Sequence, residues 1–368
     1  MDKFKIHTLL LPFSFLYEMG VNFRNKLFDL KILSGEEFSV PVISVGNISV
    51  GGTGKTPHTE YLIRLLSPKY KVAVLSRGYK RKTRGFMIAG ENSTSKSIGD
   101  EPFQMYRKFP NIIVAVDADR RRGIKKLLSL PEEQKPQVVL LDDAFQHRYV
   151  KPSLSILLTN FDRLFYNDKL LPAGRLREPW ANNSRAQIVL CTKCPDTLKP
   201  IDYRIISKEM NLFPYQDLFF SSFNYKSLLP VFQEENRVKK ESVERLKKEN
   251  YSFLLVAGLA NPSNLIEYVS GYTNDLQTLI YPDHHQFTKK NIQAIHNAFE
   301  RIENDKKIII TSEKDAVRLL DNPNISDKIK SSIFYLPIEI IFQMNQENLF
   351  KQKVESHVKN FARNRFMA

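Results

Sequence analysis

A glycine-rich segment carries the clearest chemistry in this sequence. It reads Ser-Val-Gly-Gly-Thr-Gly-Lys-Thr at residues 49–56. Small residues let backbone N–H groups curl around a phosphate at a helix N-terminus, a lysine there reaches the β- and γ-phosphates, and a threonine hydroxyl is a ligand for Mg²⁺. The segment therefore predicts a nucleotide-binding P-loop, although Ser49 stands where the usual pattern has glycine.

The flanking residues support this interpretation. Residues 40–45 form an apolar, β-branched run typical of a buried strand, and residues 57–66 show one apolar helical face with proline in the first turn. A strand, a glycine-rich loop and a helix in that order make a P-loop match specific. The predicted nucleotide-binding residues are Ser49, Val50, Gly51, Gly52, Thr53, Gly54, Lys55 and Thr56.

Two adjacent aspartates end a later apolar run. Residues 137–141 read as a strand, and Asp142 and Asp143 follow it directly. In P-loop proteins, an aspartate at this position helps to hold Mg²⁺ beside the nucleotide. We therefore predict that Thr56, Asp142 and Asp143 hold the metal.

Basic clusters follow two other predicted strands. Residues 71–76 lead into five cations within residues 77–84, and residues 111–116 lead into the cluster at 117–122. Such runs are usually solvated loops. Ligands of open α/β sheets, however, bind at the carboxyl ends of the strands, so anion recognition is favoured here.

Strands and helices alternate along most of the chain, which predicts an α/β protein with two domains. The expected fold is a P-loop NTPase-type parallel-sheet domain, a smaller Rossmann-like α/β domain and a hinge, with the active site in the cleft between the domains. The expected ranges are an N-terminal helix at 1–30, the P-loop domain at 31–212, a hinge or linker at 213–245 and the C-terminal domain at 246–368.

The composition restricts the function only loosely. The 368 residues suffice for two cores, and 55 Lys+Arg against 40 Asp+Glu give a formal charge of +15. This excess suits nucleic acid, an anionic membrane surface or a phosphorylated substrate. The two cysteines, Cys191 and Cys194, provide no disulfide framework and indicate a reducing cytosol. A lone Cys-x-x-Cys is weak support for zinc, so structural thiols are favoured.

The N-terminal residues 6–30 are rich in large apolar side chains. They lack the small-residue cleavage site of a signal peptide, and Pro12, Glu18, Asn22 and Arg24 interrupt any membrane span. The pattern fits an interfacial amphipathic helix and equally a helix that packs on the protein's own core.

Taken together, these motifs closely resemble the tetraacyldisaccharide 4′-kinase family. The resemblance covers nearly the whole chain, in residues 45–57, 76–79, 99–102, 141–147, 171–178, 283–284 and 311–317. It implies transfer of the γ-phosphate of ATP, with Mg²⁺, to the 4′-hydroxyl of tetraacyldisaccharide 1-phosphate. The product would be lipid IVA in lipid A and lipopolysaccharide biosynthesis. It also implies a peripheral, monotopic protein at the cytoplasmic face of the bacterial inner membrane.

The resemblance also implies roles for individual residues. Asp100, which on its own would be an ordinary helix cap, becomes the candidate base, and Lys55 joins it as a catalytic residue. His284 resembles the partner of Asp100, although spacing alone does not distinguish it from His285. Seven positions match residues that line the family's site: Arg77, Tyr79, Arg120, Gln146, His147, Arg177 and Glu178.

The implied acceptor lipid accounts for the remaining features. The cations at 77–84 suit a sugar phosphate or lipid headgroups, and the N-terminal helix at 1–30 suits acyl chains and the bilayer interface. Neither nucleic acid nor an obligate protein partner is expected. A ParA/MinD-like ATPase would carry lysine at the position of Val50. A nucleic-acid-stimulated ATPase would explain the charge, but no helicase motifs are visible.

Overall fold

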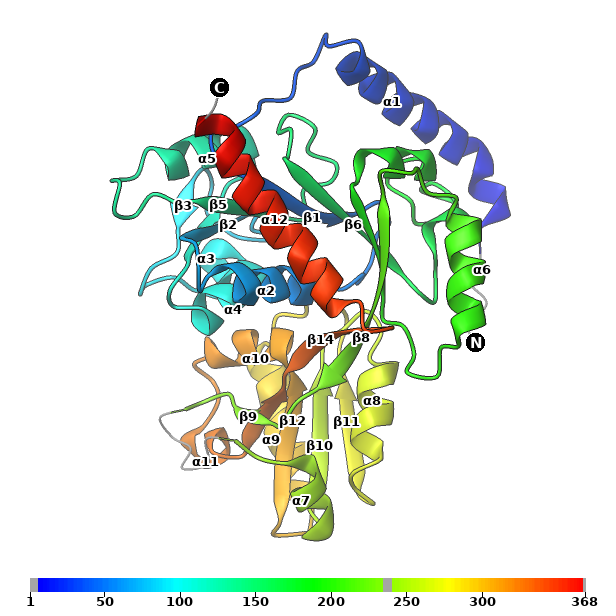
Figure 1. Cartoon of the computed structure of the whole chain (residues 1–368). Coiled ribbons are helices and arrows are strands. Elements are labelled where there is room, and N and C mark those ends of the chain that lie inside the picture. Colours follow the sequence, from blue (N-terminus) through cyan, green and yellow to red (C-terminus); the bar gives the residue numbers. More distant parts are fainter. Residues whose placement is uncertain (1–5, 234–239, 367–368) are drawn as a thin grey trace. The chain divides into compact units, whose positions relative to one another are not determined.

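A computed structural model describes residues 6–233 and 240–366, which fold into two compact units (Figure 1). Unit 1 comprises the residues up to 92, residues 105–223 and the residues from 340 onward. Unit 2 comprises residues 93–104 and 224–339. The chain therefore passes between the units four times, at 92–93, 104–105, 223–224 and 339–340.

The nine-stranded sheet of unit 1 places the P-loop strand β1 between β6 and β5. Parallel pairing runs from β8 to β4, and β3 pairs antiparallel with β4. Its central strands are buried on both faces, which is why they read as continuous apolar runs. The order is β14 (Ile338–Phe342), β8 (Asp217–Tyr225), β7 (Ile188–Thr192), β6 (Leu154–Asn160), β1 (Val42–Asn47), β5 (Val138–Asp142), β2 (Val72–Ser76), β4 (Ile113–Val116), β3 (Met87–Ile88).

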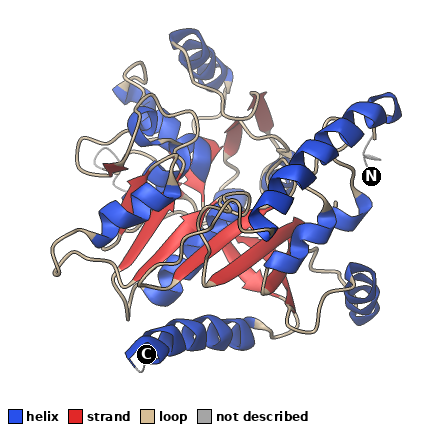
Figure 2. Cartoon of the chain, turned by 90° about the horizontal axis from the view of Figure 1, so that it is seen from above, coloured by secondary structure: helices blue, strands red, loops and turns tan. Residues whose placement is uncertain are grey.

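Helices cover both faces of this sheet (Figure 2). On one face, α2 (Lys55–Leu66) and α12 (Glu347–Phe366) pack on the same core cluster. On the other face, α5 (Arg120–Leu128) and α6 (Pro200–Met210) pack on two further clusters. Short 3₁₀ turns lie at Thr8–Leu10, Phe165–Asn167 and Trp180–Arg185.

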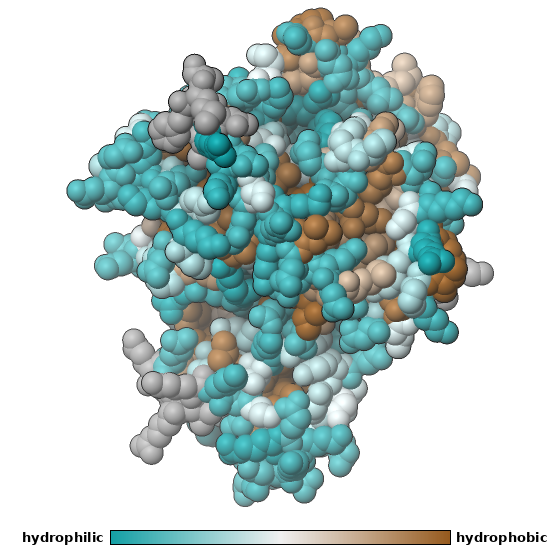
Figure 3. All heavy atoms as spheres, viewed as in Figure 1, coloured by the Kyte–Doolittle hydropathy of each residue, from teal (hydrophilic) through white to brown (hydrophobic). Residues whose placement is uncertain are grey.

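Helix α1 (Leu11–Asp29) turns most of its apolar side chains outward. Within it, only Ser14, Asn25 and Phe28 are buried. Figure 3 shows hydrophobic atoms at the surface along this helix. The exposed fractions are 60% for Phe13, 62% for Phe15, 65% for Leu16, 55% for Met19 and 66% for Phe23.

Unit 2 contains a five-stranded sheet that is parallel except for β9. Its order is β11 (Leu276–Ile280), β10 (Ser252–Ala257), β12 (Lys307–Ser312), β13 (Ile333–Leu336), β9 (Leu229–Pro230). One face is covered by α7 (Val243–Lys248) and α8 (Ser263–Ser270), and the other by α9 (Lys289–Arg301), α10 (Glu313–Leu320) and α11 (Asp327–Lys330). Helix α3 (Ser95–Ile98) also belongs to this unit, and α4 (Asp100–Lys108) begins in unit 2 and ends in unit 1.

The predicted fold class, a P-loop α/β domain and a second α/β domain, is confirmed. The compact units nevertheless differ from the expected ranges. The expected hinge or linker at 213–245 contains strand β8, because Phe219 and Phe220 pair with β7 and fill the core. Residues 347–366 belong to unit 1, because α12 buries Phe350 and Val354 there. Residues 1–5 and 234–239 of the expected helix and linker lie outside the described residues.

Candidate functional site

A second loop holds the P-loop in place. The Val50 N–H donates to the Arg175 carbonyl at 2.7 Å, and the Arg177 N–H donates to the Ile48 carbonyl, also at 2.7 Å. Ser49 forms an antiparallel bridge with the same segment. The departure from glycine at Ser49 is therefore accommodated by a sheet-like pairing that any residue can make.

Gly54 is required by its backbone and by its surroundings. Its φ of +84° lies in the left-handed region, and a Cβ there would lie 2.8 Å from Cζ of Phe223. Helix α2 starts at the next residue, Lys55, two residues earlier than the sequence predicted. The first N–H groups of this helix therefore border the loop, as an anion site requires.

Lys55 links the P-loop to the end of β5. Its Nζ lies 3.4 Å from Oδ1 of Asn47 and 3.6 Å from Oδ1 of Asp143. Burial alone would raise the pKa of Asp143, but Lys55 and Arg177 outweigh it, so the pKa falls below its ordinary value. Asp143 is thus held ionised beside the phosphate-binding loop.

The donor set around the P-loop fits Mg²⁺ bound together with a nucleotide. Asp142 is 1% exposed, and Thr59 Oγ1 donates to its Oδ1 at 3.2 Å. Asp143 follows it directly, and Thr56 lies in the first turn of α2. Mg²⁺ prefers oxygen ligands and is usually held by one or two carboxylates plus substrate phosphates. The described part of the chain contains no group of three or more His, Cys, Asp or Glu that could hold a metal ion.

Gln146, Arg177 and Glu178 form one hydrogen-bonded group next to Asp143. Arg177 Nη1 lies 3.3 Å from Oδ1 of Asp143 and 3.3 Å from Oε1 of Gln146. Gln146 Nε2 donates to Oε1 of Glu178 at 2.9 Å. Glu178 is only 3% exposed and is also paired with Arg185. It therefore orients Gln146 from within the protein.

We expect Glu178→Gln to destabilise unit 1. Removing one member of a buried ion pair costs about 3–5 kcal/mol, and because Arg185 is 23% exposed we expect a smaller loss, about 2–3 kcal/mol. Urea unfolding of the variant measures the loss. Glu209→Gln, which also removes a carboxylate hydrogen bond but at the surface, is the control and should change stability by less than about 0.5 kcal/mol.

The remaining predicted substrate residues differ in accessibility. Arg77 and Tyr79 are exposed, as a loop that meets a ligand from solvent would be. Arg120 is 3% exposed, and burial lowers its pKa to about 10. Burial, reinforced by Arg120, lowers the pKa of His147 to about 4. No described residue provides a hydrogen-bond partner for Nε of Arg120 or Nε2 of His147.

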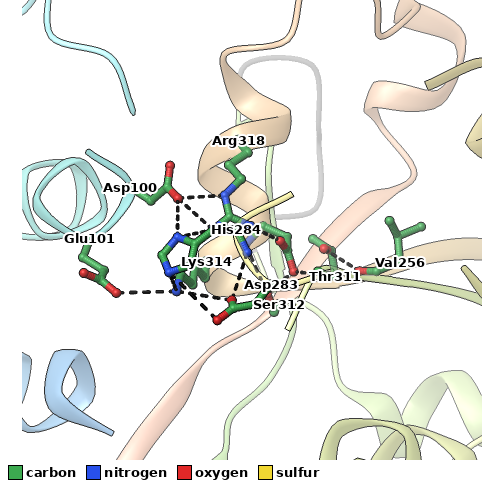
Figure 4. A network of polar contacts seen from close by, with 11 residues as sticks. Asp100, Glu101, Val256, Asp283, His284, Thr311, Ser312, Lys314 and Arg318 are labelled. Atoms are coloured by element: carbon green, nitrogen blue, oxygen red, sulfur yellow. Dashed lines mark hydrogen bonds and ion pairs between the residues drawn. The ribbon is translucent and has the colours of Figure 1, made fainter. Parts of the chain in front are cut away.

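Asp100 lies within a polar network of unit 2 (Figure 4). Its Oδ2 accepts hydrogen bonds from Arg318 Nε at 2.9 Å and Arg318 Nη2 at 2.7 Å, and it lies 3.3 Å from Nδ1 of His284. Burial acts to raise the pKa of Asp100, but the hydrogen bonds from His284 and Arg318 outweigh it and lower the pKa. Asp100 is therefore an ionised carboxylate at neutral pH.

The two adjacent histidines have different surroundings. His284, at a left-handed φ of 58°, directs its ring to Asp100. His285 stacks on Tyr281 with ring centroids 4.7 Å apart and contacts Asn291 through Nε2 at 3.0 Å. The structure thus pairs Asp100 with His284 and places His285 in the packing of its own unit.

Three residues of α10 in this network were not predicted. Arg318 bridges Asp100 and Asp315, and Lys314 Nζ lies 2.9 Å from Nε2 of His284. The segment 311–317 contributed to the resemblance, but no role was assigned within it. The available signal was the spacing of three charged residues, Lys314, Asp315 and Arg318, shortly after the buried strand β12.

The fold and these two residue groups define a P-loop phosphotransferase or nucleotide hydrolase with an accessory α/β unit. A profile of the LpxK family, described as Tetraacyldisaccharide-1-P 4′-kinase, matches residues 6–359. The chain belongs to this family.

Relatives and a solved structure agree with this membership. The chain is 51% identical to tetraacyldisaccharide 4′-kinase of Parabacteroides distasonis, over 98% of this chain and 97% of the relative. It is 52% identical to that of Bacteroides thetaiotaomicron, over 98% and 95%. The crystal structure of LpxK from Aquifex aeolicus in complex with ATP matches with a TM-score of 0.72 and 29% identity, covering 96% of this chain and 99% of that one. This family differs from both alternatives considered above, the ParA/MinD-like ATPases and the nucleic-acid-stimulated ATPases.

Proposed function

We propose that the protein transfers the γ-phosphate of ATP to the 4′-hydroxyl of tetraacyldisaccharide 1-phosphate, which yields lipid IVA for lipid A biosynthesis. The observation that supports this most is the family match over residues 6–359. A P-loop alone would fit many nucleotide hydrolases, whereas this match extends over both units.

In this proposal, unit 1 holds the nucleotide. The backbone N–H groups of residues 49–56 and the first turn of α2 bind the phosphates, and Lys55 leaves its contact with Asp143 to meet the β- and γ-phosphates. Thr56, Asp142 and Asp143 would hold Mg²⁺, which supplies charge neutralisation on the transferring phosphoryl group.

Asp100 accepts the proton of the acceptor. The O–H bond of the 4′-hydroxyl breaks, its proton passes to the Asp100 carboxylate, and the oxygen forms a bond to the γ-phosphorus. The bond from phosphorus to the β,γ-bridging oxygen breaks at the same time, and ADP leaves. A carboxylate of low pKa suits this role, because the proton leaves late in a loose phosphoryl-transfer transition state.

The other residues are assigned to the substrates. Arg77, Tyr79 and Arg177 supply exposed or partly exposed contacts for the sugar phosphate or the nucleotide. Buried Arg120 and half-buried His147 each offer one nitrogen, Nε and Nε2 respectively, that has no hydrogen-bond partner among the described residues. Gln146 is assigned to the substrates as well, and its amide is held by three neighbouring residues. They are Asn47, Arg177 and Glu178.

We further propose that α1 binds the cytoplasmic surface of the inner membrane as a peripheral element. Its Tyr17 hydroxyl donates to the Arg177 carbonyl at 2.8 Å, and Arg24 Nη2 donates to the Gln146 carbonyl at 3.0 Å. The helix is thereby attached to the loops of the site while its apolar side chains remain exposed. In the described ranges, no helix is long and apolar enough to cross a bilayer.

Phe13→Asp combined with Leu16→Asp should weaken vesicle binding at least about tenfold, because a charged side chain in the interface cannot bury apolar surface. The two positions are 60% and 65% exposed, so the fold should persist. Co-sedimentation with phosphatidylglycerol vesicles measures the effect. Ile201→Asp combined with Ile205→Asp, on the exposed side of α6, is the matched control and should bind like the wild type. Equal binding by both double variants would remove α1 as the membrane contact.

The function itself is tested with purified protein, Mg-ATP and tetraacyldisaccharide 1-phosphate in detergent micelles. The expected result is a singly phosphorylated lipid product, equal in amount to the ADP formed. ATP hydrolysis without lipid phosphorylation would overturn the proposal.

A further inference from the structure

The contacts of His284 determine where its ring proton lies. Nε2 lies 2.9 Å from Nζ of Lys314, and Nδ1 lies 3.3 Å from both Oδ2 of Asp100 and Nη2 of Arg318. Nη2 already donates to Oδ2 of Asp100 at the shorter distance of 2.7 Å, so the contact of Lys314 with Nε2 is the closer donor contact of the ring. A lysine ammonium has only donors, so Nε2 must accept that hydrogen bond. A neutral imidazole then carries its proton on Nδ1, where it donates to the Asp100 carboxylate.

We propose that Lys314 is a positioning residue that keeps His284 neutral, with its proton on Nδ1, so that Asp100 and not His284 receives the proton of the acceptor hydroxyl. This inference rests on the proposed kinase reaction. His284 already holds a proton on the nitrogen that faces Asp100, and Lys314 occupies the lone pair of the other nitrogen. Neither nitrogen is then available as a base.

Arg318 fixes the other side of the carboxylate. Its Nη1 donates to Oδ1 of Asp315 at 2.6 Å, and its Nε and Nη2 donate to Asp100. Asp315 is fully buried and also accepts from Ser312 Oγ at 2.6 Å and from the Gly258 N–H at 2.8 Å. The three contacts to Asp100 from His284 and Arg318 all end at Oδ2, which directs the acceptor hydroxyl to Oδ1.

The charges around His284 explain why Lys314 is needed. Besides Asp100, the carboxylates of Glu101, Asp283 and Asp315 belong to the same network, and Arg318 and Lys314 are its cations. Asp283 Oδ2 lies 4.0 Å from Nε2 of His284. Without Lys314, this carboxylate would favour a second proton on the ring. The imidazolium would bind Asp100 more strongly and make it a poorer proton acceptor.

Lys314→Met tests this through the pH dependence of kcat. At pH 8, the variant should retain at least about a fifth of the wild-type rate. Below about pH 6.5, the ordinary range of histidine, its rate should fall about tenfold per pH unit, while the wild type shows no such decline there. Lys314→Arg, which keeps a cation that only donates, should restore the wild-type profile.

Lys330→Met is the matched control, since Lys330 is 23% exposed against 21% for Lys314 and pairs with Asp327 on α11. It should leave the profile unchanged. A wild-type profile in Lys314→Met would overturn the proposal, and so would the same decline in Lys330→Met.

A second measurement does not depend on activity. Ring nitrogen NMR shifts of histidine-labelled protein, assigned with His284→Gln among the 7 histidines, report the tautomer directly. We expect protonated Nδ1 and unprotonated Nε2 in the wild type between pH 6 and 8, and a mixture or an imidazolium at pH 6 in Lys314→Met. Protonated Nε2 in the wild type would contradict the proposal. If the wild type failed to phosphorylate the lipid, the proposed function would be refuted. The tautomer of His284 measured by NMR would be unaffected by that failure.

Discussion

Lys55→Ala should abolish lipid phosphorylation, with kcat lowered about 10³-fold or more. Lys55 is the cation of the P-loop, and an electrostatic donor directed at a developing charge is typically worth about 10²–10³ in kcat. The loss should be larger here because binding of the β- and γ-phosphates is lost as well. Transfer of radiolabelled γ-phosphate to the lipid, measured at saturating ATP where this can be reached, gives the value.

Lys69→Ala is the matched control for Lys55. Lys69 also belongs to unit 1, its side chain is 58% exposed, and it pairs with Glu355. Its loss should leave kcat within about twofold, as expected for a surface ion pair worth at most about 1 kcal/mol. If Lys55→Ala retained a tenth of the wild-type rate while remaining folded, the P-loop could not be the phosphate site that we propose.

Asp100→Asn should lower kcat about 10²–10⁴-fold, the usual range for loss of a general base. The amide keeps the shape of the carboxylate but cannot take up the proton. The Kd for ATP, measured by calorimetry, should change by less than about threefold, because the proposed nucleotide contacts lie on the P-loop. A parallel loss of ATP affinity would indicate a different role for this residue.

The fold around Asp100 must be checked in the same variant. Arg318 is 1% exposed and would then face an amide, with only part of its charge balanced by Asp315. We therefore expect a fall in Tm as well, and the kinetic comparison belongs at a temperature well below it. Asp327→Asn, at a position where the side chain is 90% exposed, should change neither Tm nor kcat. An unchanged kcat in Asp100→Asn would eliminate Asp100 as the base.

The sequence predicted the local parts of the site well. The P-loop, the strand before it and the helix after it are contiguous, so spacing alone specifies Lys55 and Thr56 at the end of a buried strand. The same holds for Asp142 and Asp143 after β5. In both cases one segment contains the information that places the residue.

Other features depend on partners far along the chain. The spacing of His284 and His285 is uninformative, because the choice between them is made by Asp100, 184 residues away. Glu178 matches a site-lining position, yet its burial depends on Arg185 and on packing that no local pattern reveals. Lys314 and Arg318 gain their significance only from the side chains that they meet.

Helix α12 has a consequence for how the protein is made. Its Phe350, Val354 and Val358 are almost fully buried in the same core cluster as Ile43 of the P-loop strand, about three hundred residues earlier in the chain. A ribosome delivers this helix after every strand of the sheet, so the sheet that carries the P-loop stays without one of its covers until residues 347–366 have been synthesised. Unit 2 is interposed in the chain and is synthesised during that interval. Nascent chains that stop before residue 347 should therefore bind chaperones through the uncovered face of the first sheet, even though their P-loop is already complete.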